Sequence, residues 1–95
     1  MYVGRIDPES GNVSLATAAP GEAPARKHPR LAIDGDRVLM VWTEGTAWAK
    51  GGSIRWQELD LAGRPSGAAG SVDGLPVWSF ATPVPRPGGG FTILY

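Results

Sequence analysis

The feature that most constrains the fold is an unbroken apolar run, Val38 to Trp42, that lies between two turn signals. Asp34-Gly35-Asp36 precedes the run, and Asp-Gly favours the positive φ values of a tight hairpin. Glu44 to Gly52 follows it and contains three glycines, which interrupt regular structure. A short apolar run bounded by turns and rich in β-forming residues indicates a strand buried on both faces. The sequence therefore predicts a central strand over Arg37 to Thr43.

Further strands are predicted on both sides of this central one. Leu31-Ala32-Ile33 is a short apolar run that leads into the Asp-Gly hairpin. Ser53 to Asp60 alternates apolar and polar residues, which is typical of a half-exposed strand. After a turn over Ala62 to Gly67, Ala68 to Val72 reads as a short outer strand. These strands follow one another along the chain, so they predict an antiparallel four-stranded meander.

A hairpin is predicted at each end of the chain. Tyr2 to Ile6 and Asn12 to Thr17 flank the turn Asp7 to Gly11, and a Pro/Gly/Ala connection from Ala18 to Lys27 follows. Towards the C-terminus, Asp73-Gly74 predicts a turn, and Leu75 to Thr82 and Phe91 to Tyr95 predict strands on either side of Gly88-Gly89-Gly90. Pro83, Pro85 and Pro87 should end the first of these two strands, because proline cannot donate to a ladder.

Composition excludes several classes of protein. The formal net charge is zero, so the sequence offers no electrostatic argument for nucleic acid or a membrane surface as a partner. The chain contains no cysteine, which excludes disulfides and cysteine-based zinc sites. No apolar stretch approaches the roughly 20 residues of a transmembrane helix, and the first residues lack the pattern of a signal peptide. The compartment is left undetermined by these observations.

The chain shows an internal repeat at an offset of about 53 residues, close to the period of a four-stranded β-propeller blade. At this offset Ile6-Asp7 falls on Leu59-Asp60, and Val41-Trp42 falls on Leu94-Tyr95. The repeat predicts about two blades: residues 1–17 as the last strands of one blade, 28–72 as a complete blade and 75–95 as the first strands of another. The alternative is a small self-contained all-β sandwich or barrel.

The runs HPRLAID, VLMVWTEGTAW and GGSIRWQELDLAGRP, with MYVGRID before them and VWSFATP and GGFTILY after them, carry a resemblance across nearly the whole chain. The sequence resembles the C-terminal blades of bacterial sialidase-like, or neuraminidase-superfamily, β-propeller proteins. The Asp-box of that family has its nearest match at Ser71, Asp73 and Trp78, although Gly74 comes one position early and Val77 replaces threonine. The resemblance implies a structural, turn-stabilising role for these residues and is compatible with an exported parent protein.

Sialidase-like catalysis uses an arginine cluster, a tyrosine–glutamate pair and an acidic aspartate drawn from several blades. Of these, Arg5, Arg30, Arg37 and Arg55 could supply one arginine at most, so no catalytic residue is carried over. The single histidine, His28, cannot build a histidine-based metal site alone. We expect it to be a polar residue at the start of a strand, with its ring hydrogen-bonded to a neighbouring blade or turn. We therefore expect no cofactor, no metal and no catalysis by this chain alone.

Trp48 is the candidate for ligand contact, because it lies in a glycine-rich loop and binding residues concentrate on such loops. Glu44 and Lys50 flank it and complete the predicted ligand-facing set; the alternative is that Trp48 caps the edge of the sheet. The first functional hypothesis is a non-catalytic structural or interaction segment of a propeller that binds carbohydrate or protein. The second is a fragment of a glycoside-acting hydrolase with its catalytic residues elsewhere. The third is a free-standing β domain that binds along an open sheet edge, and open edges also predict self-association.

Overall fold

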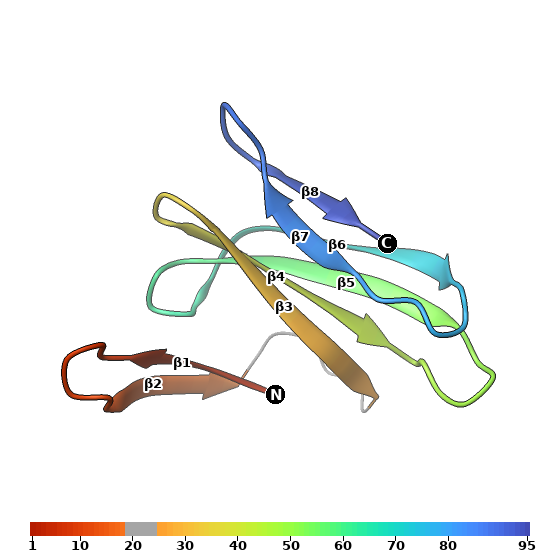
Figure 1. Cartoon of the computed structure of the whole chain (residues 1–95), viewed down its shortest axis with the longest axis horizontal. Helices are drawn as coiled ribbons and strands as arrows, with labels where there is room; N and C mark the ends of the chain where they lie inside the picture. Colours follow the sequence, from red (N-terminus) through yellow and green to blue (C-terminus); the bar gives the residue numbers. More distant parts are fainter. Residues whose placement is uncertain (19–24) are drawn as a thin grey trace.

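A computed structural model describes residues 1–18 and 25–95 of the chain (Figure 1). The described part is all-β and contains eight strands. In chain order these are β1 (Tyr2–Ile6), β2 (Val13–Ala18), β3 (Arg26–Asp34), β4 (Arg37–Glu44), β5 (Gly52–Leu59), β6 (Pro65–Leu75), β7 (Thr82–Pro85) and β8 (Phe91–Leu94). They form three antiparallel sheets, β1-β2, β3-β4-β5-β6 and β7-β8. The predicted all-β class and four-stranded meander are confirmed, and the strand pairing closes no barrel among the described residues.

The central strand is buried on both faces, as its unbroken apolar run predicted. Alternate side chains of β4 enter two separate clusters, because successive residues of a strand point to opposite faces. Val38, Met40 and Trp42 pack with Leu59 on one face, which we call face A. Leu39 and Val41 pack with Ile54, Leu75 and Ala81 on the other, which we call face B. The four-stranded sheet is therefore the layer on which the rest of the fold is built.

The two outer hairpins lie on opposite faces of this sheet (Figure 1). Met1 and Val3, from the β1-β2 end, pack against face A. Phe91 and Ile93 of β8 pack against face B. The result is a stack of a two-stranded, a four-stranded and a two-stranded sheet. The predicted connection from Ala18 to Lys27 lies mostly outside the described residues.

Strand β3 begins earlier than predicted, at Arg26 rather than in the apolar run after His28. The ladder to β4 shifts register between Lys27 and Arg30, so His28 and Pro29 together oppose a single residue of β4. This is a β-bulge, and it explains how Pro29 is accommodated without a donor in the ladder.

Strand β6 is longer than the predicted Ala68 to Val72, and it includes two stretches predicted as turns. It starts at Pro65, so the turn after β5 ends at Arg64, where the N–H of Asp60 donates to the Arg64 carbonyl over 2.9 Å. The predicted Asp73-Gly74 turn is wrong. Asp73 pairs with Ser53 and Leu75 with Gly52, which leaves Gly74 as an extra residue at φ 83°. Asp-Gly here makes a bulge within a strand, because a glycine with positive φ serves a bulge as well as a turn.

The predicted strand over Leu75 to Thr82 is also wrong. Leu75 ends β6, residues 76–81 form a turn and an irregular connection, and β7 starts only at Thr82. Pro83 and Pro85 belong to β7, where Pro83 pairs with Ile93 and Pro85 with Phe91, whereas Pro87 lies after the strand. Pro83 and Pro85 are two residues apart, so their backbone nitrogens both face the edge away from β8. The ladder between β7 and β8 therefore loses no hydrogen bond.

Candidate functional site

An open cleft of about 260 Å³ lies where three segments meet: the start of β3, the β4-β5 loop and the β6-β7 connection. Its walls are mainly aromatic, with four rings from residues that are up to 52 positions apart in the sequence. The lining residues are Lys27, His28, Thr46, Ala47, Trp48, Trp78, Ser79 and Phe80. The cleft therefore depends on the sheet topology, which brings the ends of these segments together.

The rings of this aromatic cleft are arranged as two edge-to-face pairs. The Trp48 and Trp78 centroids lie 5.4 Å apart with an interplanar angle of 84°. The His28 and Phe80 centroids lie 4.7 Å apart at 80°. Such pairs are favourable because the positive edge of one ring meets the negative face of the other. Trp48 nevertheless remains 83% exposed and Trp78 67% exposed, so large apolar surface stays open to solvent.

The backbone of the cleft is strained. Among the described residues, three non-glycine residues have positive φ: His28 at 54°, Ala49 at 53° and Trp78 at 64°. Two of them line the cleft and the third follows Trp48 directly. A left-handed conformation costs a residue with a Cβ about 1–2 kcal/mol. Strain of this kind concentrates at binding sites, where it fixes side chains in the geometry that a ligand requires.

Polar groups of the cleft are few. The ammonium of Lys27 donates to the main-chain carbonyl of Thr46 over 3.0 Å, which ties the start of β3 to the β4-β5 loop. The Thr43 hydroxyl donates to the Lys27 carbonyl over 3.1 Å and strengthens the same junction. The hydroxyl oxygen of Thr46 is buried and lacks a hydrogen-bond partner within the described structure. An unpaired buried hydroxyl is costly to a folded structure.

The three residues predicted to face a ligand occupy different places. Trp48 lines the cleft. Glu44 is buried at the end of β4, where its carboxylate accepts hydrogen bonds from Trp42 Nε1 and Arg55 Nε, both over 2.9 Å. Lys50 is exposed at the end of the loop, where its backbone bridges to Ala47, and it is not among the residues that line the cleft. The structure thus brings Trp48 together with His28, Trp78 and Phe80 instead.

The residues of the Asp-box match are spread over two elements. Ser71 and Asp73 lie within β6, opposite Arg55 and Ser53, whereas Trp78 lies in the connection after it. His28, expected to be a polar residue at a strand start, lies two residues inside β3 and packs its ring against Phe80. The signal for the missed aromatic residues was present in Val77-Trp78-Ser79-Phe80, an aromatic pair beside a proline, which is as typical of a loop as of a strand.

The four arginines considered for a carboxylate-binding cluster have separate local roles. Arg37 forms an ion pair with Glu58, and Arg55 forms one with Glu44. Arg30 donates to the carbonyl of Pro29 over 3.4 Å, and Arg5 lies on β1 in another sheet.

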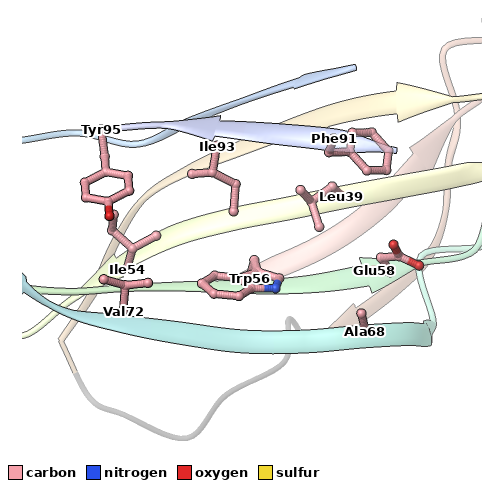
Figure 2. A pocket seen from close by; sticks show the side chains of 9 residues that line it. All are labelled: Leu39, Ile54, Trp56, Glu58, Ala68, Val72, Phe91, Ile93 and Tyr95. Atoms are coloured by element: carbon pink, nitrogen blue, oxygen red, sulfur yellow. The ribbon is translucent and has the colours of Figure 1, made fainter. Parts of the chain in front are cut away.

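A second cavity, of about 330 Å³, lies between β8 and the outer half of face B, by which we mean the part of that face towards β5 and β6 (Figure 2). Figure 2 shows Phe91, Ile93 and Tyr95 extending from β8 towards the sheet, across from residues of β4, β5 and β6. Those opposing residues are Leu39, Ile54, Trp56, Glu58, Ala68 and Val72. We call this the β8 groove.

Residues 1–18 and 25–95 contain no group of three His, Cys, Asp or Glu side chains that could hold a metal ion. In the same residues no helix is long and apolar enough to cross a membrane. Comparison of the chain with protein-family models, curated proteins and solved structures finds no match.

Proposed function

We propose that the chain is a non-catalytic binding segment of a sialidase-like β-propeller and that its aromatic cleft binds carbohydrate. The observation that carries this proposal is the convergence of exposed tryptophan rings and left-handed backbone in one cleft. The stack of sheets supports the propeller part of the proposal, because a four-stranded meander covered on both faces by further sheets is how propeller blades pack.

Carbohydrate is the ligand class that suits these walls. The C–H face of a sugar ring is apolar and flat, and stacking it on an aromatic ring removes apolar surface of both from water. Trp48 and Trp78 stand almost perpendicular to each other, so they offer two walls of a corner. A phosphate or nucleic-acid ligand is disfavoured, because among the described residues Lys27 is the one lysine or arginine that lines the cleft, and its ammonium already donates to the Thr46 carbonyl.

The lining residues also support a binding role rather than a hydrolytic one. Glycoside hydrolysis uses a pair of carboxyl groups that flank the scissile bond. The cleft is lined by no Asp or Glu among the described residues. Glu44, two residues before the lining residue Thr46, has a buried carboxylate, but this carboxylate accepts hydrogen bonds from Trp42 and Arg55.

The test is a titration of the chain with a panel of neutral and acidic mono- and oligosaccharides, followed through the four tryptophan indole N–H signals by NMR. We expect the Trp48 and Trp78 signals to move, while the Trp42 signal, fixed by Glu44, stays in place. Trp48→Ala and Trp78→Ala should each weaken binding by about tenfold or more. Leu61→Ala removes an exposed apolar side chain outside the cleft and serves as the control. Indole signals that stay unchanged with every sugar would refute carbohydrate binding, and a response to peptides alone would favour a protein ligand.

A further inference from the structure

We propose that copies of this chain associate head to tail, with β1-β2 of one copy joining β7-β8 of another to form a four-stranded sheet. The occupant of the β8 groove is then the β1-β2 hairpin of a second copy. This inference rests on the blade organisation proposed above and is independent of carbohydrate binding.

The described residues leave two apolar surfaces open to solvent. One is the β8 groove, where the outer half of face B lies open beside Phe91, Ile93 and Tyr95 (Figure 2). The other is the outer face of β1-β2, which presents Tyr2 at 77%, Ile6 at 64% and Val13 at 65% exposure. Ile6 and Val13 are cross-strand partners, so these side chains share one face of the hairpin. The groove also continues an interface that already exists, since Phe91 and Ile93 pack on face B beside it.

The internal repeat indicates how the two surfaces meet. An offset of about 53 residues places β7 and β8 on β3 and β4, and it places β1 and β2 on β5 and β6. A sheet ordered β7-β8-β1-β2 across two copies would therefore repeat the order β3-β4-β5-β6 of the central sheet. The pair Val38–Leu59 of that sheet translates to Phe91 of one copy beside Ile6 of the next.

The free edges of the two hairpins match in this register. Pro83 and Pro85 lack an N–H, so their partners Ile93 and Phe91 occupy non-hydrogen-bonded positions towards β7 and direct their own N–H and C=O groups to the free edge of β8. Directly after β1, the N–H of Asp7 donates to the Asn12 carbonyl over 2.9 Å, so Ile6, the last residue of β1, presents its backbone groups to the free edge. Phe91 would thus exchange hydrogen bonds with Ile6 of the next copy.

The side chains match as well. The register puts Ile6 of the next copy beside Phe91, and Tyr2 of the next copy beside Tyr95. Both pairs then lie on the face that looks into the β8 groove, where the partly buried Trp56 and the exposed Val72 line the opposite wall. Gly4 of the next copy falls beside Ile93 and adds no side chain there.

The same contact between copies would also cover exposed apolar side chains on face A of the central sheet. Leu31 and Ile33 are 55% and 60% exposed on face A, beside β1-β2. A preceding copy would place its β7-β8 hairpin over them, because that hairpin completes the sheet of which β1-β2 is the other half. The interface is heterologous, so it closes into a ring when the rotation per copy allows. In the assembly each copy accounts for two four-stranded sheets, its own central sheet and one shared between neighbours, so a ring of about four to eight blades holds about two to four copies.

Cysteine cross-linking tests the register directly, because the native chain contains no cysteine. Thr92 and Arg5 are exposed and would face each other across copies as a non-hydrogen-bonded pair, the closest spacing in an antiparallel ladder. We expect Thr92→Cys/Arg5→Cys to give a ladder of disulfide-linked multimers on oxidation. The control, Thr92→Cys/Ser14→Cys, moves the second thiol one strand away and should give about tenfold less. A mixture of the two single variants, Thr92→Cys and Arg5→Cys, should form mixed dimers only.

Two results would overturn the proposal: a chain that sediments as a monomer and does not cross-link, or multimers that cross-link equally in the control pair. The sugar titration is a separate readout. A chain that cross-links in register but leaves its indole signals unmoved by sugar would refute only the carbohydrate cleft. A monomer whose Trp48 signal responds to sugar would refute only the assembly.

Discussion

The guanidinium of Arg55 donates from Nε to the Oε2 atom of Glu44 over 2.9 Å, which links β5 to the end of β4. The other carboxylate oxygen accepts from the indole of Trp42 over 2.9 Å. Glu44 is 7% exposed, and a buried carboxylate needs partners. Arg55 balances its charge, and the hydrogen bond from Trp42 fixes its position. The Glu44 carboxylate, predicted from the sequence to face a ligand, thus stabilises the end of the central strand β4.

We expect Glu44→Ala to lower the free energy of unfolding by about 1–3 kcal/mol, because it leaves the buried indole N–H of Trp42 without an acceptor. Glu44→Gln should cost less, since its amide oxygen can still accept from Trp42. Urea unfolding of both variants measures the difference. A similar loss in both would show that the Arg55 ion pair, rather than the Trp42 hydrogen bond, dominates.

Packing on face B predicts a large effect at Ile54, which is 1% exposed between β4 and β6. Ile54→Ala should destabilise the chain by about 2–5 kcal/mol through lost burial and the cavity left behind. Ile33→Ala removes the same atoms from an exposed site and should cost less than about 1 kcal/mol in the isolated chain. Denaturant midpoints with unchanged slopes would provide the comparison, and equal losses would contradict the burial argument.

The indole of Trp56 lies over Gly70, its cross-strand partner on β6. A methyl group at Gly70 would collide with that rigid ring, so we expect Gly70→Ala to cost about 1–3 kcal/mol and to shift the Trp56 indole signal. Gly67→Ala, on the same strand, would meet the carboxylate of Glu58, which can swing aside. An unchanged Trp56 signal in Gly70→Ala would show that the ring does not cover the glycine.

The first hairpin predicts a pH dependence. The backbone N–H of Glu9 and the hydroxyl of Ser10 donate to the Asp7 carboxylate and lower its pKa below the ordinary value. Because the pKa is lower in the folded state, the stabilisation is complete above the unfolded pKa of about 3.9 and is lost as the pH falls through the folded pKa. Asp7→Asn should remove this part of the acid sensitivity. An NMR titration of the Asp7 carboxyl carbon checks the shift, and a midpoint at or above the ordinary pKa would contradict it.

The sequence predicted strands best where the apolar pattern alone determines burial. The run from Val38 to Trp42 has an apolar residue at every position, and both faces of β4 are indeed buried. Turn signals were less decisive, since Asp34-Gly35-Asp36 closes a hairpin whereas Asp73-Gly74 makes a bulge. The dipeptide supplies the same positive φ in both places, and only the neighbouring strand decides which structure forms.

The cleft was predictable only in part, because its residues come from distant segments. Trp48 could be identified from its own loop, but His28 reaches the cleft through a bulge in β3 and Trp78 through a left-handed turn after β6. Neither irregularity could be read from local preference, since positive φ is uncommon for residues other than glycine. Their conformations are imposed by the packing of the surrounding segments.

Each ladder in the described structure joins strands that are consecutive in the chain. The short hairpin loops therefore keep paired residues close along the sequence, and little chain entropy is lost before a contact forms. Each hairpin can form as soon as its second strand leaves the ribosome, without waiting for a distant segment. Folding during synthesis should accordingly follow the order of the chain, with the β7-β8 hairpin docking on a central sheet that is already complete.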